Sequence, residues 1–184
     1  MNITFPNVLL LIILSFSCIS CENTENKVIS DTPLEQREFQ ESRNSFYSAY
    51  EAAPNEIKKS DIFNNSRKHT CSFKSKYGDS FTSWTGTVAN ISTDQGGDEV
   101  TIFSIVSNEH GVPVSYQQMG IKRGTALYKQ ISELSIDQKV YFNFSFEDEA
   151  YSSNVKECFD ERSLTELGSL EEPEFRVNFT AVRK

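Results

Sequence analysis

A strict alternation of apolar and polar side chains near the C-terminus constrains the fold more than any other feature. Between Lys139 and Phe146 every second side chain is apolar, and the segment from Phe175 to Ala181 repeats the pattern. A period of two places the apolar side chains on one face of a β-strand. The chain has 14 phenylalanines, and such large rings favour a compact β core. Two such strands predict the interior of a small barrel.

Three earlier segments also have the character of strands. They cover residues 81–93, 99–106 and 114–121, and turn sequences rich in glycine separate them. Gly86 lies in the middle of the first segment, where it predicts a bend or a bulge of the kind that a small barrel needs.

Three helices are expected beside these strands. Residues 34–53 and 56–75 carry imperfect apolar stripes, and Asn55 is a suitable N-cap for the second helix. Thr125 is a suitable N-cap for a short helix after the third strand. The N-terminal helices are interpreted as packing elements, and the alternative is that the first one is an arm that binds a partner.

The order of three strands, a short helix and two strands is that of an OB-fold. The expected fold is therefore mainly β with N-terminal helices: a five-stranded OB-like Greek-key barrel with a short helix between strands 3 and 4. Residues 84–182 also resemble the OB-like domains of bacterial envelope proteins grouped as tRNA-anticodon-binding-like. The matching pieces are Trp84-Thr85-Gly86-Thr87-Val88, Gly96-Gly97, Leu127-Tyr128, Val140-Tyr141-Phe142, Glu157-Cys158, 163–169 and Pro173-Glu174-Phe175. The group name describes a shape and implies no contact with RNA.

The N-terminus has the pattern of an export signal. Val8 to Leu14 is an unbroken apolar run, too short for a membrane-spanning helix. The next residues, Cys18-Ile19-Ser20-Cys21, resemble a bacterial lipobox, which implies cleavage after Ser20 and lipid on Cys21. A lipid anchor would hold the chain in the cell envelope, and Glu22 favours the outer membrane facing the periplasm. The alternative is an ordinary secretory signal and a secreted protein.

Four segments follow from these patterns. Residues 1–20 are expected to be a signal peptide, and residues 21–33 a lipidated, flexible tether because they are polar and lack periodicity. Residues 34–80 would form a helical region that packs on the barrel, and residues 81–184 the barrel itself.

Two cysteines remain in the mature domain, Cys71 and Cys158. In an oxidising compartment an isolated pair of cysteines usually forms a disulfide, so we expect these two to be joined. Free thiols and a metal site are the alternatives. No histidine spacing matches a zinc motif, and we expect no metal or other cofactor.

OB-folds usually bind ligands on the face of strands 2 and 3. Phe103, Tyr116 and Gln118 lie on those strands and are candidate contacts for a base or a sugar. The alternative is that they pack against the N-terminal helices.

The connection 147–172 is long and acidic, which would attract a basic protein or a divalent cation. Glu157, Asp160 and Glu161 are its candidate contacts, and the alternative is a solvated loop that keeps the protein soluble. The second helix carries a basic cluster, which is interpreted as a solvated face. The alternative is contact with anionic headgroups or with the acidic connection. The cluster consists of Lys58, Lys59, Arg67, Lys68, Lys74 and Lys76.

The charge and the motifs limit the function classes. A formal net charge of -8 repels phosphate backbones and argues against nucleic acid as a partner. No nucleophile elbow, phosphate-binding loop or metal-binding helix motif occurs, so no enzyme is expected. The leading hypothesis is a membrane-anchored, non-enzymatic module that recognises a protein or envelope component. A secreted inhibitor or immunity-type protein with an acidic loop and an oligonucleotide-binding OB-fold are the alternatives.

Overall fold

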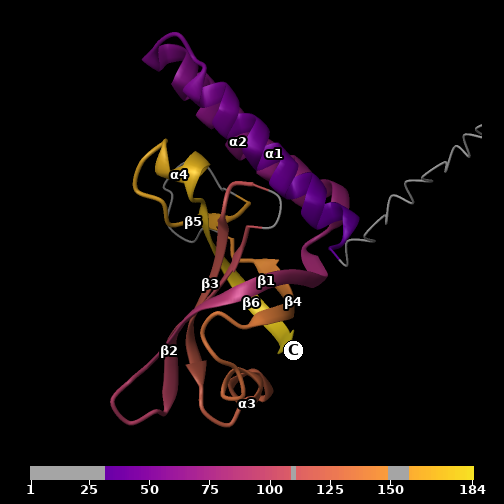
Figure 1. Cartoon of the computed structure of the whole chain (residues 1–184), viewed down its shortest axis with the longest axis vertical. Helices are drawn as coiled ribbons and strands as arrows, with labels where there is room; N and C mark the ends of the chain where they lie inside the picture. Colours follow the sequence, from indigo (N-terminus) through magenta and orange to yellow (C-terminus); the bar gives the residue numbers. More distant parts are fainter. Residues whose placement is uncertain (1–31, 109–110, 149–157) are drawn as a thin grey trace, which may run out of the picture.

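The computed structural model describes residues 32–108, 111–148 and 158–184. A hairpin of two helices comes first and a β-barrel follows (Figure 1). The elements are α1 (Leu34–Glu51), α2 (Glu56–Tyr77), β1 (Ser80–Thr93), β2 (Glu99–Ser107), β3 (Val114–Lys122), α3 (Ala126–Ile131), β4 (Lys139–Phe146), β5 (Asp160–Glu161), α4 (Gly168–Glu171) and β6 (Glu174–Arg183).

Five strands close into a barrel. Along the sheet the order is β3-β2-β1-β4-β6-β5, and a short parallel pairing of β3 with β6 closes the cylinder. The five-stranded OB-like barrel with a helix between its third and fourth strands is thus confirmed. β5 is an additional strand of two residues that pairs with β6. It and α4 are too short to show a periodic pattern in the sequence.

Aromatic rings fill the barrel. Phe142, Phe144, Phe175 and Phe179 are each at most 5% exposed, as the alternation of apolar residues predicts. Trp84 of β1 is fully buried among them, and its ring centroid lies 5.0 Å from that of Phe144 in an edge-to-face arrangement. Tilted and edge-to-face contacts of this kind stabilise a core beyond the burial of apolar area alone.

Gly86 allows β1 and β2 to approach closely. A Cβ atom at this position would lie 2.6 Å from Ile105 Cγ2 and 2.9 Å from the carbonyl oxygen of Val106. The irregularities in the pairing of β1 lie on either side of Gly86, and Ser83 adopts a φ of 57° within one of them. The bend expected at the glycine therefore comes from bulges around it, while the glycine itself makes room for β2.

The helical hairpin covers one end of the barrel, and α3 lies at the opposite end (Figure 1). Phe39 of α1 is fully buried against the barrel, 5.8 Å from the ring centroids of both Trp84 and Phe175. The side-chain amide of Gln36 donates to the carbonyl oxygen of Thr85 (2.7 Å) and accepts from its N–H (2.8 Å). This amide therefore pairs with β1 as a peptide group of a neighbouring strand would.

The helix caps agree with the sequence. The side chain of Asn55 accepts a hydrogen bond from Lys58 N (3.0 Å), and that of Thr125 accepts from Tyr128 N (3.1 Å). Each cap satisfies one backbone N–H of a first helical turn. α2 continues to Tyr77, slightly beyond the expected end.

Candidate binding surface

Three of the expected contact residues face inward. Phe103 and Tyr116 are both fully buried within the barrel, so neither ring can stack on a ligand at the surface. Gln118 accepts a hydrogen bond from Phe179 N (2.6 Å) and thus links β3 to β6. Burial of Phe103 and Tyr116 corrects the expectation that their rings form a contact surface, whereas Gln118 is half-buried. The sequence of β2 carries apolar residues on both faces and so did not indicate its orientation.

The outer face of β2 and β3 has little to offer a nucleic acid. Successive residues of a strand point to opposite faces, so the neighbours of the buried residues point outward. Beside the buried rings, no outward side chain of these two strands is aromatic or basic, whereas OB-folds that bind single strands use rings and positive charge. These outward residues are Ile102, Val106, Ser115, Gln117 and Met119. Ser104 is buried, and the exposed Lys122 at the end of β3 pairs with Glu99.

The acidic connection lies along α2. Four residues of the helix contact the described part of the connection. They follow one another at intervals of seven, four and three positions, so they lie on one face of the helix. The basic cluster of α2 therefore contacts the acidic connection through two of its members, as one alternative proposed. The contacts are Ser60 with Glu166, Arg67 with Glu161, Cys71 with Cys158 and Lys74 with Asp148.

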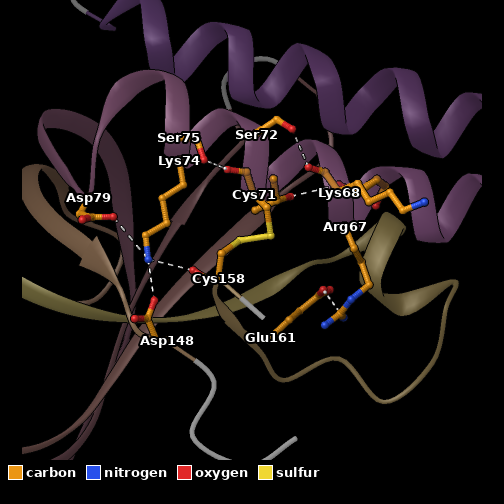
Figure 2. Close-up of a disulfide and its surroundings, with 12 residues drawn as sticks. Arg67, Lys68, Cys71, Ser72, Lys74, Ser75, Asp79, Asp148, Cys158 and Glu161 are labelled. Atoms are coloured by element: carbon orange, nitrogen blue, oxygen red, sulfur yellow. Dashed lines mark hydrogen bonds and ion pairs between the residues drawn. A yellow bond between two sulfur atoms is a disulfide. The ribbon is translucent and has the colours of Figure 1, made fainter. Parts of the chain in front are cut away.

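The disulfide is the covalent part of this attachment. Cys71 and Cys158 are joined, with their Cα atoms 5.6 Å apart. One helical turn further on, Lys74 Nζ bonds to Asp148 Oδ1 (2.6 Å) and to the carbonyl oxygen of Cys158 (2.9 Å), and lies 3.6 Å from Asp79 (Figure 2). The ammonium group thus binds one carboxylate that follows α2 and one from the connection, beside the disulfide that joins the same two segments.

The two described candidates of the connection already have partners. The side chain of Glu161 is 3% exposed and lies 3.3 Å from Arg67 Nη1. Burial raises the pKa of Glu161, while hydrogen bonding from Ser169 and the nearby arginines oppose this shift. Asp160 Oδ2 lies 3.7 Å from Arg176 Nε. These carboxylates stabilise the attachment of β5 and are poorly placed to attract a partner.

Two expected sites, Glu157 and the lipidation site Cys21, lie outside the described residues. The expectations for them remain predictions. Within the described ranges, no group of three or more histidine, cysteine, aspartate or glutamate side chains is placed to hold a metal ion. No helix in the same ranges has the length and apolar character needed to cross a membrane.

Arg43 is a residue that the sequence did not single out. Its side chain is 1% exposed, and its Nη2 donates to the carbonyl oxygen of Ser66 (3.0 Å) and to Thr70 Oγ1 (2.8 Å). Burial lowers the pKa of Arg43 to about 10, and the carboxylate of Glu161 opposes this shift. The guanidinium therefore joins α1 to α2 beside the end of the barrel. The available sequence signal was the pair of small hydroxyl residues one turn apart on α2.

A groove lies where α1, the β2–β3 loop and α4 meet. This hairpin groove has a volume of about 450 Å³. The phenol of Tyr47 has a raised pKa, chiefly because of the carboxylate of Glu171, and also because of burial and Glu51. No local sequence pattern indicates the groove, because its walls come from three distant segments. Its lining residues are Asn44, Tyr47, Ser48, Gly111, Val112, Pro113, Glu171 and Glu172.

Exposed apolar side chains occur in the first turn of α2 and in the connection that is bound to this end of the helix. Ile57 is 76% exposed, and Leu164 and Leu167 in the connection are 98% and 39% exposed. Ser60 Oγ donates to Glu166 Oε1 (2.7 Å), which brings the connection against α2 next to Ile57. We call Ile57, Leu164 and Leu167 the tip patch.

Comparison with known proteins adds no relative: no protein family, curated protein or solved structure matches this chain.

Proposed function

We propose that this chain is a non-enzymatic binding module that a lipid on Cys21 holds at the bacterial envelope. Its partner is a protein, and the contact lies on the hairpin side of the molecule: α1, α2, α4 and residues 162–172. The exposed apolar side chains of the tip patch carry this proposal, because large apolar groups left in water, here on α2 and on the connection that Ser60 binds, are typical of interaction sites. The aromatic side chains of β2 and β3, in contrast, are buried in the core of the barrel.

The anchor can be tested by metabolic labelling. Radiolabelled palmitate should enter the wild-type protein and should not enter Cys21→Ala, since only the sulfhydryl of Cys21 would receive the diacylglycerol. Cys18→Ala is the matched control and should keep the label. A wild-type protein that is unlabelled and soluble would contradict the anchor.

The contact surface can be tested by photo-crosslinking in intact envelopes. A benzoylphenylalanine at Leu164, within the tip patch, should give a discrete adduct with another protein. The control is the same probe at Met119, which is 47% exposed on the outer face of β3 and should give none. Adducts from Met119 alone would overturn the proposed surface, and no adduct from either position would count against a protein partner.

One alternative has support of its own. Glu171 and Glu172 are exposed at the end of α4, as a secreted inhibitor that covers a basic target would require. Capture by such an inhibitor would weaken steeply with salt, whereas an apolar contact would persist. The oligonucleotide-binding alternative has no comparable support on the barrel face. A fluorescence titration with single strands at low salt should show no binding.

A further inference from the structure

The walls of the hairpin groove are held in place before any partner arrives. Val112 N donates to Asn44 Oδ1 (2.6 Å), which fastens the β2–β3 loop to α1. Gly111 has a φ of +122°, and a Cβ at this position would lie 2.2 Å from Asn44 Nδ2. On the opposite wall Leu170 of α4 is fully buried. A preformed groove loses little conformational entropy on binding.

The floor and the rim of the groove differ in character. Tyr47, Val112 and Pro113 supply an aromatic ring and apolar surface, while Glu171 and Glu172 supply carboxylates. Among the described residues, neither Glu171 nor Glu172 forms an ion pair, in contrast to Asp148 and Glu161, which pair with α2, and Asp160, which pairs with β6. Tyr47 and Glu171 line the same groove, and the carboxylate raises the pKa of the phenol. The groove therefore combines an aromatic ring with negative charge.

We infer that the hairpin groove receives a lysine or arginine side chain of the partner protein. The alkyl stem lies against Tyr47, Val112 and Pro113, and the positive group reaches the carboxylates of Glu171 and Glu172. A long basic side chain matches both parts of the groove, because its stem is apolar and its end is charged. An aromatic face beside a cation adds a further attraction. This inference rests on the proposed function and specifies the chemistry of the partner.

Fluorescence anisotropy with a rhodamine-labelled hexalysine peptide tests the inference on the mature full-length protein in neutral detergent. The double variant Glu171→Gln/Glu172→Gln should bind the peptide about tenfold more weakly than the wild type, which corresponds to about 1.4 kcal/mol. The control Glu35→Gln/Glu133→Gln removes the same charge elsewhere and should change the affinity less than about twofold. A hexapeptide of acetyl-lysine should not bind.

Tyr47 separates groove binding from general attraction to an acidic protein. Tyr47→Phe should keep the affinity, since the ring remains, and Tyr47→Leu should reduce it. Equal losses in the groove variant and in the charge-matched control would overturn the inference, as would tight binding of the acetylated peptide. If the Leu164 probe captures a partner while these results fail, the inference falls and the proposed function stands. If the groove variants behave as expected and no partner is captured, the groove binds basic side chains, but the protein partner of the proposed function falls.

Discussion

Among single residues, Arg43 has the most demanding surroundings, because its charge is buried between two helices and the barrel. Arg43→Ala should lower the free energy of unfolding by about 3 kcal/mol, since it leaves a cavity and removes the donor to Ser66 and Thr70. Arg43→Met should cost less because it keeps most of the volume. Urea denaturation measures the free energy of unfolding of both Arg43 variants. Arg123→Met, at an exposed ion pair with Asp98, should change stability by less than about 1 kcal/mol.

A second prediction concerns Gly86, where there is no room for a side chain between β1 and β2. In Gly86→Ala the new methyl group would meet Ile105 and a backbone oxygen of β2, which cannot both withdraw without opening the barrel. We expect a loss of about 3 kcal/mol in thermal or urea unfolding. Gly96→Ala in the exposed β1–β2 turn is the control and should stay within about 0.5 kcal/mol of the wild type. Similar effects of the two substitutions would show that β1 and β2 are less tightly packed than described.

His69 introduces a dependence on pH. Burial lowers its pKa from the usual 6.5, and the positive charges of Arg43 and Lys76 lower it further. The unfolded chain therefore takes up a proton more readily than the folded one, so stability is complete above pH 6.5 and declines as the pH falls through that value. Titration of the His69 ring by NMR should show a midpoint below 6.5. His69→Gln should remove this part of the pH dependence of unfolding, and a midpoint above 6.5 would contradict the assignment.

At the scale of elements, α2 and the connection after β4 act together. The disulfide closes a long loop, with a sequence separation of 87 residues, and chain entropy predicts a contribution of about 4 kcal/mol. Cys71→Ala/Cys158→Ala should unfold at a correspondingly lower urea concentration. Its unfolding midpoint should not respond to dithiothreitol, whereas that of the wild type should fall. A wild type insensitive to reductant under denaturing conditions would show that the bond does not form in solution.

The elements differ in how well their sequences predict them. The bounds of β4 follow directly from the alternation between Lys139 and Phe146, and the caps at Asn55 and Thr125 are local features that need no knowledge of the fold. The docking of α1 is different. It depends on Gln36 and other polar side chains whose partners lie about 50 to 70 positions away. A polar residue on a helix is ordinarily read as solvated, so such contacts emerge only from the folded chain.

For the whole molecule, the order of strands and helices was enough to predict the barrel, because a five-stranded cylinder with one crossing helix is among the few ways to close such a sheet. The binding face was not predictable in the same way. Alternation shows which residues share a face of β3, but Tyr116 could be assigned to the inside only when the closure with β6 was known. The hairpin groove combines three distant segments, so no local pattern in the sequence indicates it.

The pairing of Gln36 with Thr85 has a consequence for how copies of this protein behave toward one another. Unpaired main-chain groups of a strand are a template on which a second polypeptide can extend a sheet. Here a glutamine from the first helix already holds both main-chain groups of Thr85. The helix thus occupies the main-chain groups of Thr85 beyond the end of the β1–β2 pairing, so that another strand cannot bind there.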